Sequence, residues 1–157
     1  VTAIWFSSGN TAADTAGAKR NIIRNCEIST GMDVALSVLN SYGILAGSNS
    51  IGINQGRNND DNQYLDNRIV KCRHGICLIG GATTNRCDNN IIAGNIIGPD
   101  ITGSDNIGAN GIFVSLQDNC VISRNLIQNV GGTFGLKGMS TIQSTVSKKC
   151  TVQYSDN

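Results

Sequence analysis

The stretch NNIIAGNIIGP, from Asn89 to Pro99, places two aliphatic pairs on either side of a short polar step that ends in asparagine. The same arrangement recurs three more times. The other copies are NIIRNCEI, NQYLDNRIV and NCVISRNLI, at Asn21–Ile28, Asn62–Val70 and Asn119–Ile127. Repetition of one pattern along a chain is typical of repeat proteins, in which each unit buries its apolar face against the next unit.

A second motif alternates with the asparagine segments and begins with glycine followed by an aliphatic residue. It starts at Gly43, Gly75, Gly111 and Gly135, and AIWFSSGN from Ala3 is a related copy. Apolar residues alternate with period two, which predicts β-strands with one buried face. The expected inward column is Ile4, Ile44, Ile76, Ile112 and Leu136, and the expected outward column is Trp5, Leu45, Cys77, Phe113 and Lys137.

The composition narrows the class of protein. The chain of 157 residues is long enough for one domain with a core, has 15% charged residues and a net charge of +1, and contains 19 Gly and one Pro. This balance gives no electrostatic reason to expect a nucleic-acid partner, and no apolar stretch is long enough to span a membrane. The six cysteines do not have the spacing of a zinc site. For Cys120 and Cys150, which occupy equivalent positions, a disulfide and a pair of stacked thiols are equally compatible with the pattern.

The repeats predict an all-β solenoid of about five coils that occupies residues 1–157 as a single domain, without evident end caps. Strands of successive coils would pair in parallel about 4.8 Å apart, so that equivalent side chains stack. Asparagine suits the corners because it tolerates a left-handed backbone and because stacked amides hydrogen-bond to one another. The predicted ladder is Asn25, Asn67, Asn95 and Asn125.

The steps Asn67-Arg68-Ile69, Asn95-Ile96-Ile97 and Asn125-Leu126-Ile127, together with the glycine-led strands, resemble the right-handed parallel β-helix superfamily, the pectate-lyase-like fold. The resemblance covers nearly the whole chain and implies a right-handed winding. Many enzymes of this superfamily cleave polysaccharides, but the fold also carries other functions.

Candidate catalytic residues are few. Asp60-Asp61 is the only adjacent pair of acids, and Arg73-His74-Gly75 is similar to the GHG element of polygalacturonases, whose other elements have no match here. Glycoside hydrolysis needs two carboxyl groups that flank the scissile bond. The alternative for His74 is a strand-entry side chain in one column with Tyr42, Asn110 and Phe134. No cofactor is expected, although loop acids such as Asp100 and Asp105 leave a Ca²⁺ site as an alternative.

Exposed aromatic residues in a row bind sugars or partner proteins, so Trp5, Tyr42 and Phe113 are candidate binding residues. The alternative is that other segments cover this face. Because site motifs and end caps are missing, the sequence favours a non-enzymatic, extracellular or cell-surface β-helix with a structural, adhesive or self-assembling role. Its expected partners are copies stacked end to end or adjoining coils of a longer chain, of which this chain would be a fragment. A lyase, a glycoside hydrolase or a carbohydrate-binding module is the alternative.

Overall fold

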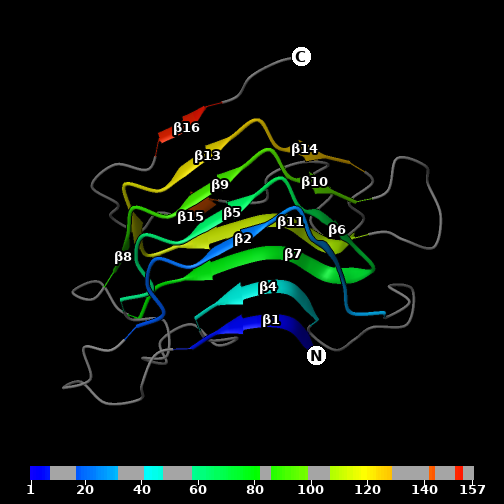
Figure 1. Cartoon of the computed structure of the whole chain (residues 1–157), viewed down its shortest axis with the longest axis horizontal. Helices are drawn as coiled ribbons and strands as arrows, with labels where there is room; N and C mark the ends of the chain where they lie inside the picture. Colours follow the sequence, from blue (N-terminus) through cyan, green and yellow to red (C-terminus); the bar gives the residue numbers. More distant parts are fainter. Residues whose placement is uncertain are drawn as a thin grey trace.

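The computed structural model describes residues 1–7, 17–31, 41–47, 58–81, 86–98, 107–128, 142–143 and 151–153. Within these residues the chain is all-β, without a helix, and every strand pairing is parallel (Figure 1). Consequently, no helix in the described part is long and apolar enough to cross a membrane.

The strands form three larger sheets and one two-stranded sheet. Sheet A contains, in spatial order, β1 (Thr2–Phe6), β4 (Tyr42–Ala46), β7 (Cys72–Ile79), β11 (Ile107–Ser115) and β15 (Ile142–Gln143). Sheet B contains β2 (Ile22–Arg24), β5 (Gln63–Leu65), β9 (Ile91–Ala93), β13 (Val121–Ser123) and β16 (Thr151–Gln153). Sheet C contains β3 (Glu27–Ser29), β6 (Arg68–Val70), β10 (Ile96–Ile97) and β14 (Leu126–Ile127), and the small sheet pairs β8 (Cys87–Asp88) with β12 (Gln117–Asp118).

The chain visits sheets A, B and C in rotation. Strands β1, β2 and β3 follow one another along the sequence, and each lies at the edge of its sheet. Strands β4, β5 and β6 then lie one position further along the same three sheets, and this order continues through β7, β9 and β10 and through β11, β13 and β14. Each of these sets is called a row below, numbered from the first, and Figure 1 shows the succession from blue to yellow across the sheets.

The pairing registers place equivalent residues of the repeats next to one another. Ile4 pairs with Ile44, Ile44 with Ile76, and Ile76 with Ile112, as the period-two pattern predicted. Leu136 and Lys137, which were expected to extend the two columns, lie outside the described residues. The inward columns of the three sheets meet in one core, whose members from sheets B and C include Tyr64, Ile92, Ile122, Ile28, Ile69 and Ile97.

Gly43 and Gly75, which begin two of the sheet A motifs, are explained by the close approach of the neighbouring strand and of sheet C. A Cβ atom on Gly75 would lie 2.5 Å from the carbonyl oxygen of Gly111 and 2.7 Å from Cγ2 of Ile97. A Cβ on Gly43 would similarly lie 2.6 Å from Cγ2 of Ile69. Such distances are well inside van der Waals contact, so only glycine fits where these strands pack on β6 and β10.

An asparagine ladder runs across the rows immediately before sheet C. The side chain of Asn95 accepts from both the backbone and side-chain nitrogens of Asn67, at 3.0 Å each, and Asn125 accepts from Asn95 in the same way. The predicted first member, Asn25, lies one residue too early. Cys26 occupies that place, and its backbone N–H donates to Oδ1 of Asn67.

A second asparagine ladder precedes sheet B. Its members lie at the start of the repeated asparagine segments, but the repeat pattern predicted only the ladder before sheet C. The backbone N–H of Asn21 donates to Oδ1 of Asn62, and that of Asn62 donates to Oδ1 of Asn90. In the fourth row Cys120 stands where the next asparagine would be. Gln117 then supplies the missing acceptor, because its Oε1 lies 2.9 Å from Nδ2 of Asn90.

The residue just before each ladder position has a left-handed backbone. Asn25, Asp66, Gly94 and Arg124 have φ angles of 55°, 51°, 68° and 52°, and Arg20, Asp61, Asn89 and Asn119 form the matching set before sheet B. Asn25 therefore belongs to a corner column, not to the ladder. Asparagine, aspartate and glycine adopt this conformation most readily, which explains why the corners are rich in them.

The outward face of sheet A is partly buried. Trp5 pairs with Leu45, Leu45 with Cys77, and Cys77 with Phe113, so the predicted outward column exists. Trp5 is 55% exposed, whereas Leu45 is only 2% exposed and packs in a second apolar cluster with Tyr42, Cys77 and Ile79. The column is therefore not a continuous exposed stripe of aromatic residues.

Candidate functional site

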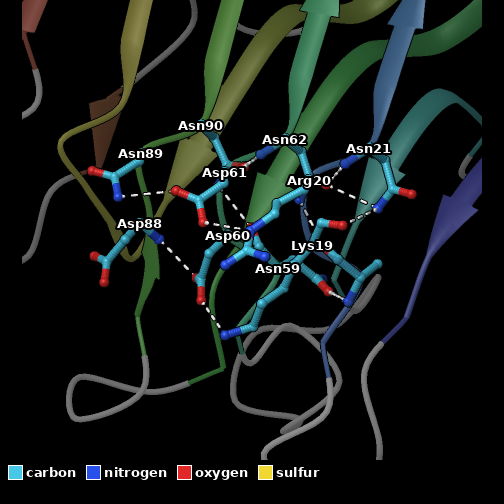
Figure 2. Close-up of polar contacts among 11 residues, drawn as sticks. Lys19, Arg20, Asn21, Asn59, Asp60, Asp61, Asn62, Asp88, Asn89 and Asn90 are labelled. Carbon is cyan, nitrogen blue, oxygen red and sulfur yellow. Dashed lines mark hydrogen bonds and ion pairs between the residues drawn. The ribbon is translucent and has the colours of Figure 1, made fainter.

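A group of charged and amide side chains joined by ion pairs and hydrogen bonds lies at the corner that precedes sheet B. In the first three rows the residues three positions before the sheet B strand are Lys19, Asp60 and Asp88, and in the fourth row the residue is Asp118. Figure 2 shows most of this group, and we call these four residues together with Arg20, Asp61 and Arg86 the charged corner. Parallel pairing brings them together, because Asp88 and Asp118 are Cα partners in β8 and β12.

Each acid of the second row already has a structural partner. Nζ of Lys19 lies 2.8 Å from Oδ2 of Asp60, and Oδ1 of Asp60 accepts from the backbone N–H of Asp88 at 3.0 Å (Figure 2). Oδ1 of Asp61 accepts from Nδ2 of Asn89, while its other oxygen lies 3.9 Å from Nε of Arg20. The two candidate catalytic acids thus join rows to one another.

Asp88 differs from its neighbours because no cation forms an ion pair with it among the described residues. Asp88 pairs with Asp118 on one side, and on the other its backbone N–H donates to Asp60. These two neighbours are paired with Arg86 and Lys19, respectively. Partial burial, followed by the negative charges of Asp60, Asp118 and Asp61, raises the pKa of the Asp88 carboxyl above its ordinary value, and Lys19 opposes this shift. Burial and the neighbouring carboxylates therefore both disfavour the ionised form of Asp88.

We expect Asp88→Asn to stabilise the fold at pH 7 by a few tenths of a kcal/mol, the scale of exposed charge interactions. The raised pKa means that ionising Asp88 costs stability in the folded state, so the wild type loses stability as pH rises through that pKa. The advantage of the variant should therefore shrink as the pH is lowered toward 3, which urea unfolding at several pH values would measure. Asp66→Asn, which removes an acid that is paired with Arg24, is the control and should destabilise. A variant advantage that grows at low pH would contradict this assignment.

Arg86 holds the fourth row to the third. Its Nε lies 2.7 Å from Oδ1 of Asp118, and its side chain is 10% exposed. Nη2 of the same guanidinium is buried and has no hydrogen-bond partner among the residues that the structure describes, and the same holds for the hydroxyl of Tyr64 in the core. Burying a polar atom without a hydrogen bond lowers the free energy of unfolding, so both groups reduce the stability of the fold.

His74 does not belong to the charged corner. It lies in β7, its backbone N–H donates to the carbonyl oxygen of Ser41, and its ring stacks on Tyr42 with centroids 4.9 Å apart. Nδ1 of His74 is 2.9 Å from Nδ2 of Asn110. An amide nitrogen only donates, so this contact is a hydrogen bond in the tautomer that carries the ring proton on Nε2. Burial, followed by the charge of Arg73, lowers the pKa of His74 to about 4, so the ring is neutral at pH 7.

The contacts of His74 and those of the two acids have no residue in common within the described structure. Tyr42, His74 and Asn110 pair along sheet A, as expected for the strand-entry column, and Phe134 lies outside the described residues. The acids contact Lys19, Arg20, Asp88 and Asn89 instead. An acid–histidine constellation is therefore not assembled here.

The three candidate binding residues are also not equivalent. Trp5 is exposed, and its Nε1 donates to the carbonyl oxygen of Gly47 at 2.7 Å. Tyr42 is 6% exposed, and Phe113 is partly buried against the outer cluster. Of the three, only Trp5 presents most of its ring to solvent.

Metal and thiol chemistry find little support in the described part of the chain. No group of three or more His, Cys, Asp or Glu side chains there is arranged to hold a metal ion. Asp100, Asp105 and Cys150 lie outside the described residues, so the Ca²⁺ alternative stays a sequence prediction. Cys72 and Cys87 are buried, and burial raises the pKa of each thiol to about 12, which makes them poor nucleophiles.

The sequence pattern missed Lys19, Asp88 and Asp118 as members of one site. What they share is their position, three residues before the sheet B strand. This common position is visible only when the repeated segments are aligned on the strand that follows them. Comparisons of this chain with protein-family models, with curated proteins and with solved structures find no match in any of the three.

Proposed function

We propose that the chain is a right-handed parallel β-helix that serves as a non-enzymatic structural or adhesive scaffold outside the cell or at its surface. The observation that carries the proposal is the rotation of the chain through sheets A, B and C, with each return one strand further along in register. A chain that repeats this circuit buries a continuous core and gains length by adding rows. The handedness rests on the superfamily resemblance.

The use of the polar side chains supports a scaffold. The asparagine ladders satisfy backbone groups between rows, and Asp60 and Asp61 join rows through ion pairs and amide bonds. A glycosidase needs one acid that is free to protonate a leaving group and a second that acts on the sugar or on water. Asp60 and Asp61 both bond to neighbouring rows and share no contact with His74, which favours a role in holding the rows together over a role in catalysis.

The edge strands suggest the partners. Among the described strands, β1, β2 and β3 each lie at the edge of a sheet. Strand edges that are left unpaired recruit further strands. In this scaffold the partners are further rows, supplied either by copies stacked end to end or by adjoining coils of a longer chain. A carbohydrate-binding module is the second candidate, and the exposed ring of Trp5 favours it.

The test combines particle shape with polymer chemistry. We expect negative-stain images of the purified chain at rising concentration to show particles that lengthen at constant width, and we expect no release of reducing ends from pectin or alginate. Reducing-end release that disappears in Asp61→Ala would replace the scaffold with a polysaccharide-active enzyme. Retention on a polymer that is lost in Trp5→Ala, without cleavage, would support the binding module instead.

A further inference from the structure

The first row is joined to the second by a set of ion pairs that the next interfaces do not share. Among the described residues, four of the five ion pairs connect residues 17–31 to residues 58–70, and the fifth is the Arg86–Asp118 pair described above. The four pairs are Lys19–Asp60 at 2.8 Å, Arg20–Asp61 at 3.9 Å, Arg24–Asp66 at 3.4 Å and Glu27–Arg68 at 3.2 Å. In three of them the first row supplies the cation.

Backbone hydrogen bonding does not distinguish this interface from the next one. The backbone N–H of Cys26 donates to Oδ1 of Asn67, just as that of Asn67 donates to Oδ1 of Asn95. Gln63 likewise donates to the carbonyl oxygen of Asn21 as Ile91 donates to that of Asn62. The side chain of Asn67 makes a second bond to Asn95 for which Cys26 has no counterpart. The two interfaces therefore differ in this amide bond, in apolar burial and in charge.

Apolar burial in sheet B is smaller in the first row. Ile23 is only partly buried, whereas Tyr64 and Ile92, at the equivalent position in the next two rows, are fully buried. Cys26 is exposed where Asn67 and Asn95 are buried. Because burial supplies most of the free energy that holds packed elements together, the first row relies more on its charges than the others do.

These charges are accessible to salt. The side chains of Arg20, Arg24 and Glu27 are 84%, 60% and 70% exposed. The screening length in water falls from about 10 Å at 0.1 M salt to about 3 Å at 1 M, which is close to the separations within the pairs. Salt should therefore weaken this interface more than the interface between the second and third rows, which holds no ion pair among the described residues.

We propose that residues 17–31, with strands β2 and β3, form an ionic latch: a segment whose docking on β5 and β6 is controlled by salt concentration and which opens as a unit while β1 and the later rows stay paired. Opening uncovers the edges of β5 and β6, with the carboxylates of Asp60, Asp61 and Asp66. The latch depends on the observed strand pairing alone, so it stands or falls separately from the proposed scaffold function.

Amide hydrogen exchange on the ¹⁵N-labelled full chain tests the latch. The reporters are the N–H groups of Gln63 and Arg68, which bond carbonyls of the first row, and the matched controls are those of Ile91 and Ile96, which bond carbonyls of the second row. Raising NaCl from 20 mM to 1 M should speed exchange of the two reporters about tenfold through local opening, and change the controls less than about twofold. Gly47, which bonds Phe6 in β1, is a further control, since none of the four ion pairs involves β1.

A charge swap supplies the second arm. Glu27 and Arg68 are both substantially exposed, so Glu27→Arg and Arg68→Glu place like charges together without disturbing the core. Each single variant should speed exchange of the reporters at 20 mM NaCl, and the double variant should restore the wild-type rate to within about twofold. Equal responses of reporters and controls, the absence of a salt response, or additive effects in the double variant would each overturn the latch.

Discussion

Replacing Asn95 by alanine is expected to lower the free energy of unfolding by about 3–5 kcal/mol, because several buried polar groups lose their partners at once. The Asn95 side chain is fully buried, accepts from two nitrogens of Asn67, and donates to the carbonyl oxygen of Tyr64 and to Oδ1 of Asn125. Alanine leaves the backbone N–H of Asn67 buried without an acceptor. Urea unfolding followed by circular dichroism would measure the loss.

Asn21→Ala is the matched control for this ladder variant. Asn21 lies in the first row, where its side chain donates to Asn62 and to the exposed carbonyl oxygen of Lys19. Water can replace both bonds in part, so we expect a loss of about 1 kcal/mol or less. Similar losses for the two variants would show that the buried ladder contributes no more than a surface amide.

Gly75→Ala is expected to lower the free energy of unfolding by about 3 kcal/mol, which is comparable to the effect of Asn95→Ala. This value is the upper range for overpacking a core. The new Cβ would meet the backbone of Gly111 on one side and the side chain of Ile97 on the other. The neighbouring strand cannot yield without breaking the register of β7 and β11. The same unfolding measurement applies, and a chain that fails to fold counts as the same outcome.

Gly31→Ala separates the effect of space from the effect of backbone conformation. Gly31 has a φ of +70° and no atom within 4 Å of an added Cβ, so its replacement meets open space. The cost should be limited to the left-handed conformation, about 1 kcal/mol. If Gly31→Ala cost as much as Gly75→Ala, the close approach of sheets A and C would not explain the glycine motif.

Much of the fold could be predicted because its signals are local and repeated. The inward isoleucine column and the outward column of sheet A depend only on period-two alternation, and the observed registers match them. The position of Asn25 was mistaken by one residue because the segment RNCEI offers an asparagine at the corner and a cysteine at the ladder. Spacing between asparagines could not distinguish the two, since both positions favour that residue.

The charged corner was less predictable. Asp60 and Asp61 attract notice as adjacent acids, but their roles depend on Lys19 and Asp88, which lie 41 and 28 residues away along the sequence. His74 was placed correctly in its column, yet its neutral ring depends on burial, which the composition of a strand does not reveal. The covering of Leu45 and Cys77 could not be inferred either, because an outward position says nothing about what lies above it.

The asparagine ladder has a direction. Among the described residues, the ladder oxygens of Asn67, Asn95 and Asn125 accept from the row before them. The amide nitrogens of Asn67 and Asn95 also donate to the oxygen of the next row. The dipoles of successive amides are consequently aligned, and the two extremities of such a stack are chemically distinct. A further row that pairs before the first ladder residue must offer hydrogen-bond donors, and one that pairs after the last must offer acceptors. Rows can therefore be added in only one orientation.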